Sequence, residues 1–220
     1  MNRRVLVVAV LVVAVVGFAI AALLYPQAKE PAYQPVTHAQ TSAPQRTENL
    51  VRFHSPSFGP SDASVTVVEF FDPSCEACRA FYPIVKQMME KHPQDIRLVL
   101  RYVPNHQGSE EAARILEAAR KQDLFVPVIE ALLDSQPAWH DDPQIVAAWQ
   151  AAEQAGLNVE QAREQMMSAN IDAALERDTA DAKRLGVRGT PTFFVNGRPL
   201  TEFSAQQLYD LIKSEIDRRP

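Results

Sequence analysis

The chain contains two cysteines, and they stand close enough in the sequence to act on one another. They occur in the segment Cys75-Glu76-Ala77-Cys78. Two thiols at this spacing can close a disulfide, and the second can resolve a mixed disulfide that the first has formed. A purely structural disulfide would contribute little here, because so small a loop barely restrains the unfolded chain. The pair therefore indicates a redox-active site.

Other uses of a closely spaced cysteine pair fit the sequence less well. A c-type haem site needs a histidine directly after the second cysteine, where this chain has Arg79. A zinc site needs two further ligands. The five histidines are scattered along the sequence, at positions 38, 54, 92, 106 and 140. We therefore expect no metal and no cofactor, with a non-catalytic module that handles metal through the two thiols as an alternative.

The sequence around the pair predicts the elements that must position it. Val65–Phe71 is a near-continuous run of β-formers, which indicates a strand buried on both faces. A helical stretch follows from Cys75 to about Lys91, and Ile96–Tyr102 predicts a second strand. Strand, helix and strand at this spacing indicate a βαβ unit with parallel strands. Cys75 then lies at a helix N-terminus, where backbone N–H groups and the helix dipole lower the pKa of a thiol.

Three further features of the sequence point to the cysteine pair. Glu69 is a lone acid in the apolar strand, and burial would raise its pKa. We expect Glu69 to relay protons to the cysteines, with an exposed edge strand as the alternative. Pro83 lies inside the predicted helix and should bend it. The segment Gly189-Thr190-Pro191-Thr192 directly precedes a predicted hairpin.

The rest of the domain consists of one long helical block and a closing β-hairpin. Residues 109–185 are predicted to be helical almost throughout, with a helix start at Asp142-Pro143. Thr192–Leu200 predicts a hairpin around the turn Asn196-Gly197. Ser204 then opens a last helix. The expected fold class is α/β, with a mixed central sheet that is flanked by helices and interrupted by a helical insertion.

The N-terminus predicts export from the cytoplasm. Two arginines precede an apolar run from Val5 to Leu24, which is long enough to cross a bilayer core. We expect residues 1–24 to be an uncleaved transmembrane anchor, with a cleaved signal peptide as the alternative. Residues 25–49, rich in Pro, Ala, Gln and Thr, are expected to form a flexible tether. Residues 50–220 are expected to form the folded domain.

The charge of the chain excludes one class of partner. The formal net charge is −5, from 22 Lys and Arg against 27 Asp and Glu, and no run of basic residues stands out. Nucleic-acid binding depends on clustered Lys and Arg. We therefore expect no nucleic-acid partner.

These motifs together resemble the DsbA-like branch of the thioredoxin superfamily. The resemblance rests on Glu69-Phe70-Phe71 with Cys-x-x-Cys after three further residues, and on Pro83 inside the helix. It also rests on residues 187–197, which are similar to the cis-proline segment of that superfamily. The resemblance covers about residues 50–218 and implies a thioredoxin fold with a helical insertion.

The resemblance also implies roles for individual residues. It makes Cys75 the exposed nucleophile and Cys78 the buried resolving cysteine. Glu69 matches the buried acid of the family. Thr190 and Pro191 match the loop that faces the disulfide and pairs with the backbone of the substrate.

Two departures from the strongly oxidising members of the family concern the redox potential. The dipeptide between the cysteines is Glu76-Ala77 rather than Pro-His, and Thr190 stands before the proline where strong oxidants often carry valine. Glu76 puts a like charge beside the thiolate of Cys75, which disfavours it. We therefore expect the pKa of Cys75 to lie above that of the strongly oxidising relatives.

The predicted function is that of a periplasmic thiol–disulfide oxidoreductase. It would exchange the Cys75–Cys78 disulfide or dithiol with cysteines of exported proteins, anchored in the bacterial inner membrane by a single helix and served by a membrane redox partner. The tether is too short for the dimerisation domain of isomerase relatives, so we expect a monomer. The alternative is a reductase or isomerase kept reduced by a membrane electron donor.

Overall fold

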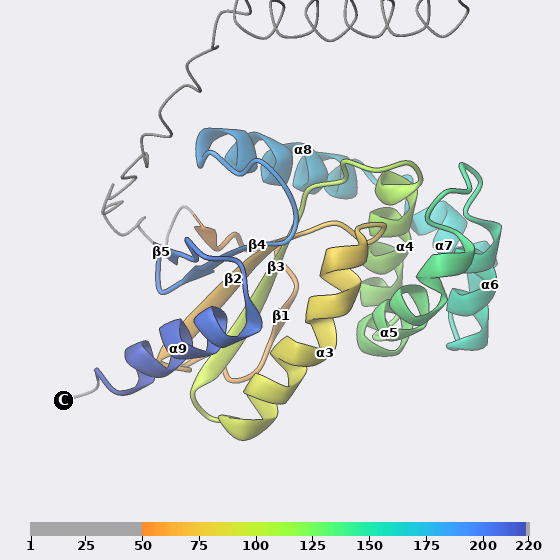
Figure 1. The fold of residues 1–220 in the computed structure, drawn as a ribbon. Coiled ribbons are helices and arrows are strands. Elements are labelled where there is room, and N and C mark those ends of the chain that lie inside the picture. The colour runs from red at the N-terminus through yellow and green to blue at the C-terminus, as the bar shows by residue number, and fades with distance from the viewer. Residues whose placement is uncertain (1–49, 219–220) are drawn as a thin grey trace, which may run out of the picture. The chain divides into compact units, whose positions relative to one another are not determined.

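The computed structural model describes residues 50–218, and within them five strands form one sheet (Figure 1). The strands are β1 (Ser57–Phe58), β2 (Val65–Phe71), β3 (Ile96–Tyr102), β4 (Thr192–Val195) and β5 (Arg198–Pro199). They lie in the order β1-β3-β2-β4-β5. β2 and β3 run parallel, whereas β1 pairs antiparallel with β3, β4 with β2, and β5 with β4. The expected mixed sheet is confirmed.

Helices flank this sheet and fill the connection between β3 and β4. α3 (Glu76–Lys91) follows β2, and α9 (Ala205–Ile216) follows β5. Between β3 and β4 lie α4 (Ser109–Lys121), α5 (Phe125–Ser135), the 3-10 helix η1 (Gln136–Ala138), α6 (Val146–Gln154), α7 (Val159–Gln165) and α8 (Ala169–Arg184). Pro83 lies inside α3, as the sequence predicted.

The two parallel strands are buried, and most of their residues are apolar. Val65 pairs with Ile96 and Phe71 with Tyr102, so β2 and β3 are in register along their whole length. Every residue of β2 except Thr66 is buried. Both strands end where the sequence predicted. β1 was not predicted, because a strand of two residues carries no periodicity.

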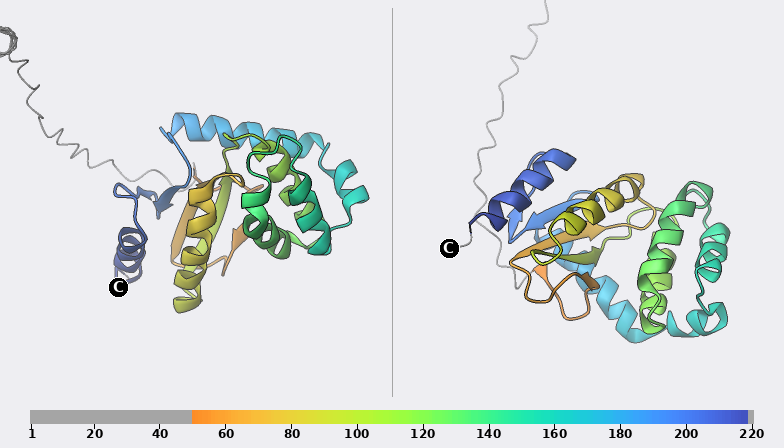
Figure 2. Two further views of the ribbon diagram at one scale, coloured as in Figure 1. Left: turned by 45° about the vertical axis from the view of Figure 1, so that its right-hand side comes forward. Right: turned by 90° about the horizontal axis from the view of Figure 1, so that it is seen from below.

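Alternate side chains of β2 pack on opposite faces of the sheet, as the pleat of a strand requires. Val67 and Phe71 join the core that includes side chains of α3 and α9. Val68 and Phe70 join a smaller cluster with Ala182 of α8. The right-hand view of Figure 2 shows α3 and α8 on opposite sides of the sheet. The strand that leads to Cys75 is therefore covered on both faces.

The predicted helix start at Asp142-Pro143 is wrong. α6 begins at Val146, directly after Ile145, whose φ of 42° is left-handed. The Asp142 carboxylate accepts hydrogen bonds from the N–H groups of Gln144 at 3.0 Å and Val146 at 3.1 Å. Asp can satisfy backbone donors in a turn as well as at a helix N-terminus. The capping motif in the sequence is the same for both outcomes.

The closing hairpin and the last helix form as predicted. Asn196 and Gly197 have φ values of 46° and 82°, the left-handed conformation that a tight hairpin turn requires at both positions. The hydroxyl of Ser204 accepts from the N–H of Gln207 at 3.2 Å and caps α9.

A cluster of buried charges joins β3, α8 and the N-terminal end of the described chain. Arg101 of β3 is fully buried and donates to Asp178 at 2.6 Å and to Asp181 at 2.7 Å, both in α8. It also donates to the carbonyl of Leu50 at 2.6 Å. Arg52 donates to Asp181 at 2.7 Å. These contacts hold α8 against the sheet.

The predicted anchor (residues 1–24) and tether (residues 25–49) lie outside the described residues and stay predictions. Within residues 50–218, no helix is both long enough and apolar enough to span a membrane.

Candidate active site

Cys75 lies at the point where β2 gives way to α3. It is the N-cap residue of α3, with an extended backbone (φ −76°, ψ 121°). Its N–H donates to the carbonyl of Asp72 at 3.1 Å, and 8% of the residue is exposed. Its thiol donates to the carbonyl of Thr190 at 3.2 Å. Cys75 therefore occupies the predicted helix N-terminus and contacts the predicted substrate-facing loop.

The surroundings of Cys75 favour its thiolate. A hydrogen bond with the side chain of Cys78 has the largest effect and lowers the pKa of Cys75, while burial acts in the opposite direction. Hydrogen bonds with the Thr190 side chain and with the backbone of Ala77 and Cys78 lower it further, and the net pKa is about 5. The exposed Glu76 is not among these contacts, and water screens its charge. Cys75 is therefore ionised at neutral pH.

Cys78 has the opposite environment. It is fully buried, and burial, followed by the hydrogen bond with Cys75 and the charge of Glu69, raises the pKa of Cys78 far above its ordinary value. Its sulfur accepts a hydrogen bond from the N–H of Asp72 at 3.5 Å. Both cysteines are free thiols. The site thus pairs a thiol of lowered pKa with a fully buried thiol of raised pKa. The resemblance implied an exposed nucleophile, but Cys75 is buried as well, with 8% of the residue exposed.

The loop before β4 lies against the cysteine pair. The peptide bond between Thr190 and Pro191 is cis, whereas the sequence by itself offered only the low base rate for such a bond. A groove of about 620 Å³ is lined by Thr190, Pro191, Phe193 and Phe203, among others. The structure therefore brings together the two segments that the sequence singled out, and it places a groove along the one that contains Thr190 and Pro191.

Glu69 is a buried acid in the strand that leads to the cysteines. It is 1% exposed and lies opposite Leu100 of β3 and Phe193 of β4. Within residues 50–218, its Oε1 atom has no hydrogen-bond partner. Burial first, and the charge of Cys75 second, raise the pKa of Glu69 to about 8. The alternative of an exposed edge strand is wrong, because β2 is the central strand of the sheet.

Comparison with known proteins agrees with this geometry. Residues 53–214 match the family model described as Thioredoxin. The chain belongs to the thioredoxin family.

Relatives of this thioredoxin-family chain include proteins of disulfide chemistry. It is 29% identical over 174 residues to disulfide bond formation protein D of Bacillus subtilis, across 74% of this chain and 76% of that protein. A thioredoxin-like oxidoreductase from Silicibacter pomeroyi has a TM-score of 0.70 and 29% identity, across 80% of this chain and 99% of the other. The expected kinship with DsbA-like proteins is confirmed, as is the class of protein-disulfide oxidoreductase at the level of the family.

Other relatives are longer proteins that contain a similar segment. The Na(+)/H(+) antiporter NhaA of Herminiimonas arsenicoxydans is 34% identical over 142 residues, which is 64% of this chain and 22% of the antiporter. The chain thus spans about a fifth of the length of the curated antiporters that it matches.

The raised pKa of Glu69 predicts a specific pH dependence of stability in this thioredoxin-family domain. The unfolded carboxyl ionises near pH 4.5, but the folded one stays protonated up to about pH 8. The folded state therefore binds more protons in this window, and stability falls as pH rises through it. In the oxidised protein Cys75 carries no charge and burial alone raises the pKa, so Glu69→Gln should abolish a loss of up to about 3 kcal/mol in the free energy of unfolding between pH 5 and pH 8. Urea unfolding at both pH values measures it.

The comparison at pH 5 serves as the internal control. The folded protein then has a largely neutral side chain at position 69 in both variants, so the difference in stability measures only the replacement of a carboxyl by an amide. The oxidised form removes the titration of Cys75 from the profile. Parallel pH profiles for the two proteins would contradict the burial of an unpaired carboxyl at this position.

Asp72 organises the loop before Cys75, a role that the sequence analysis missed. Its buried carboxylate accepts from the N–H of Ser74 at 2.9 Å and from the hydroxyl of Ser109 at 2.5 Å. It also accepts from the ring of His106 at 2.7 Å, and this bond is the main reason that the pKa of His106 is raised. The sequence signal for Asp72 was that of a strand breaker, and its distant partners carried no local signal.

Gln136 is a second positioning residue that the sequence analysis missed. It is fully buried in η1. Its amide donates to the carbonyls of Pro73 at 2.7 Å and Cys75 at 3.1 Å, and its oxygen accepts from Arg79 at 3.0 Å. The helical connection between β3 and β4 therefore supports the start of α3 directly. A single Gln in a polar stretch gives no sequence signal for this role.

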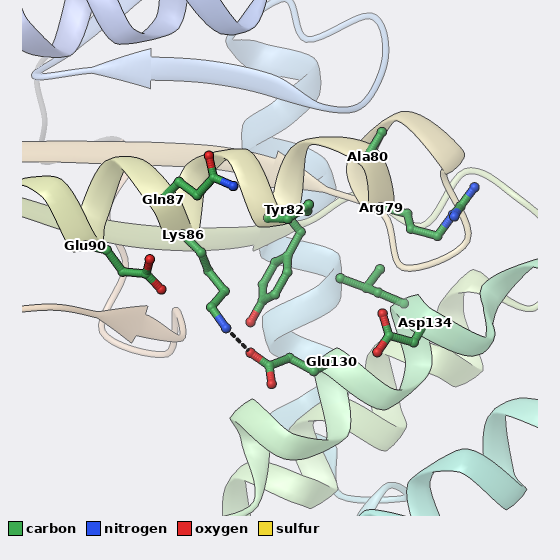
Figure 3. A pocket seen from close by; sticks show the side chains of 10 residues that line it. Arg79, Ala80, Tyr82, Lys86, Gln87, Glu90, Glu130 and Asp134 are labelled. Carbon is green, nitrogen blue, oxygen red and sulfur yellow. Dashed lines mark hydrogen bonds and ion pairs between the residues drawn. The ribbon is translucent and has the colours of Figure 1, made fainter.

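A separate cavity of about 620 Å³ lies between α3 and α5 (Figure 3). Arg79, Tyr82 and Lys86 of α3 line it opposite Glu130 and Asp134 of α5. Lys86 pairs with Glu130 at 2.6 Å. Burial, followed by the charge of Glu130, raises the pKa of Tyr82 above its ordinary value. The residues that line this cavity include neither cysteine, so it is distinct from the redox pair.

Within residues 50–218, no group of three His, Cys, Asp or Glu side chains is arranged to hold a metal ion. The structure therefore adds no third ligand to the two thiols in support of the metal-handling alternative. It stays a hypothesis that rests on the two thiols alone.

Proposed function

We propose that this chain is a periplasmic thiol–disulfide oxidoreductase that exchanges its Cys75–Cys78 pair with cysteines of exported proteins. The observation that carries the proposal is the contrast between an ionised Cys75 and a buried, protonated Cys78. This contrast supports Cys75 as the nucleophile and Cys78 as the resolving cysteine. Thr190 and Pro191 bind the backbone of the client beside them.

Oxidation of a client takes two balanced exchange steps. A client thiolate attacks Cys75 of the oxidised pair, the Cys75–Cys78 bond breaks, and Cys78 leaves with the electron pair and takes up a proton. A second client thiolate then attacks the client sulfur of the mixed disulfide, and Cys75 leaves as a thiolate. Two client thiols are oxidised and the pair is reduced. The low pKa of Cys75 makes it a good leaving group in the second step.

Glu69 supplies and accepts the proton of Cys78 in this scheme. With a pKa of about 8 it is protonated at neutral pH and close to its titration point. When Glu69 is ionised, its charge raises the pKa of Cys78 further, which supports a coupling between the two groups. A group with a pKa near the working pH is the most effective proton donor and acceptor.

The proposal extends to location and partners. Residues 1–24 anchor the chain in the inner membrane, or are cleaved as a signal peptide; residues 25–49 form the tether, and residues 50–220 form the catalytic domain in the periplasm. A membrane redox partner reoxidises the pair. The protein is a monomer. The length of the apolar N-terminal run supports the anchor.

Net oxidation is the favoured direction, and the reduction potential of the pair tests it. A pKa of about 5 for Cys75 lies between roughly 7 in thioredoxin and roughly 3.5 in DsbA. Stabilising the reduced form makes a disulfide more oxidising, so we expect a potential between about −270 and −120 mV. Equilibration with glutathione buffers measures it.

A potential below about −270 mV would assign the chain to the reductase alternative. The double replacement Glu76→Pro/Ala77→His tests the contribution of the dipeptide. It should make the potential less negative, because it removes a like charge and adds an imidazole beside the thiolate.

A further inference from the structure

A cavity of about 510 Å³ lies beside Cys75 and is positively charged. Cys75 and Thr190 are part of its wall, and His106, Lys183 and Arg188 also line it. The residues that line it include no Asp and no Glu. The whole chain carries a net charge of −5. The group of basic residues beside Cys75 is therefore opposite in sign to the net charge of the protein.

The three basic residues reach the cavity from three different segments. His106 follows β3 and is held by Asp72 at 2.7 Å, with its side chain half exposed. Lys183 lies in the last turn of α8, and Arg188 lies in the loop just before Thr190. A basic residue in the last turn of a helix complements the helix dipole, which accounts for Lys183 but not for Arg188.

Neither Lys183 nor Arg188 has an acidic partner in the part of the chain that the structure describes. Both residues are exposed, and no ion pair within residues 50–218 includes either of them. Their neighbour Arg184 behaves differently, because it pairs with Asp181 at 2.6 Å. The charges at the cavity are therefore available to a ligand.

We propose that this cationic cavity binds a carboxylate that the substrate carries close to its reacting sulfur, so that the chain prefers acidic thiols and disulfides. The inference rests on the proposed exchange at Cys75. When Cys75 attacks a substrate disulfide, the substrate S–S bond breaks, a mixed disulfide forms on Cys75, and the other substrate sulfur leaves as a thiolate. A carboxylate near the bonded sulfur then lies beside the basic side chains, which attract it before and during the attack.

The carboxylate can belong to a client polypeptide or to a small acidic thiol, and two sets of probes separate these sources. The first set is a disulfide-linked peptide with Asp next to its cysteine, with matched Asn and Lys peptides. The second set is oxidised glutathione, which is anionic, 2-hydroxyethyl disulfide, which is neutral, and cystamine, which is cationic. The rate constant for oxidation of the reduced full chain is measured with each probe at low and high salt.

The variant Lys183→Ala/Arg188→Ala is compared with Arg177→Ala, which removes an exposed cation from the same helix outside the cavity. We expect the ratio of acidic to neutral rate constants to be lower in the double variant than in the wild type by up to about fivefold for each cation removed, since an exposed ion pair is worth up to about fivefold. Arg177→Ala should keep the ratio. High salt should reduce the ratio in the wild type.

If the double variant lowers the ratio of acidic to neutral rate constants for the peptide probes alone, the cavity binds the carboxylates of polypeptide clients. If the ratio falls for glutathione as well, the cavity also binds small acidic thiols. An unchanged ratio in the double variant, or an equal fall in Arg177→Ala, would overturn the inference and leave the proposed function intact. If the reduced chain exchanges with none of the probes, including the neutral disulfide, the proposed function is overturned together with the inference.

Discussion

Cys78→Ser is expected to accumulate covalent complexes with client proteins through Cys75, whereas Cys75→Ser is expected to accumulate few. In the first variant the Cys75 thiolate attacks a client disulfide, the client S–S bond breaks and the other client sulfur leaves as a thiolate; because no thiol stands at position 78 to attack the mixed disulfide on Cys75, that mixed disulfide persists. In the second variant the remaining thiol is buried, and its raised pKa keeps it protonated. Non-reducing electrophoresis of exported proteins, followed by mass spectrometry, measures the trapped complexes.

The expected difference between the two variants is at least about tenfold. At pH 7 a thiol with a pKa of about 5 is almost entirely ionised, while a thiol with a pKa of 9 or above is about 1% ionised or less. The more basic thiolate is the stronger nucleophile, which offsets part of this advantage. Equal trapping by the two variants would contradict the assignment of their roles.

The choice of serine at position 78 provides a further control. The hydrogen bond with Cys78 is the largest influence that lowers the pKa of Cys75. A serine hydroxyl can donate in the same way, whereas alanine cannot. Cys78→Ala should therefore trap complexes more slowly than Cys78→Ser at slightly acidic pH, because a larger fraction of its Cys75 is protonated.

Arg101→Met is expected to destabilise the domain by about 3–5 kcal/mol. Arg101 is fully buried and donates to two acids of α8, which have no exposure of their own. Removing the guanidinium leaves the carboxylates of Asp178 and Asp181 buried with fewer partners, which costs more than the ion pair contributes when it is intact. Chemical denaturation at neutral pH measures the loss.

A matched control comes from an exposed ion pair. Lys86→Met breaks the pair with Glu130, whose side chains are 47% and 37% exposed, and should cost about 0–1 kcal/mol. Adding Asp178→Leu to Arg101→Met should recover part of the stability, because one of the unpaired buried charges is then removed. If Arg101→Met lowered the free energy of unfolding by as little as Lys86→Met does, the proposed cost of leaving Asp178 and Asp181 buried without Arg101 would be contradicted.

The sequence by itself determined the elements whose signals are local. The run of β-formers gave β2 and β3 with the observed ends, and the Asn-Gly turn gave the closing hairpin. These signals are local because side-chain periodicity and turn conformation depend on neighbouring residues. The same local reading failed at Asp142, where one capping side chain serves a turn instead of a helix.

The sequence also determined the chemistry to be expected, since only two residues of the chain are thiols and they stand three positions apart. The tertiary structure decided how reactive each thiol is. Thr190, 115 residues from Cys75, lies against its sulfur, and the hydrogen bond of the Thr190 side chain lowers the pKa of Cys75. Burial of Cys78 depends on the complete core. Both effects on pKa arise from desolvation and hydrogen bonding in three dimensions, so the Cys-x-x-Cys motif alone could not provide them.

The buried polar partners were likewise decided by the tertiary structure alone. Arg101 meets Asp178 across 77 residues, Gln136 meets Pro73 across 63, and Asp72 meets His106 across 34. Each is a polar side chain whose burial is tolerated because a distant group satisfies it. The sequence shows the donors and acceptors separately, and only folding brings each pair within hydrogen-bond distance.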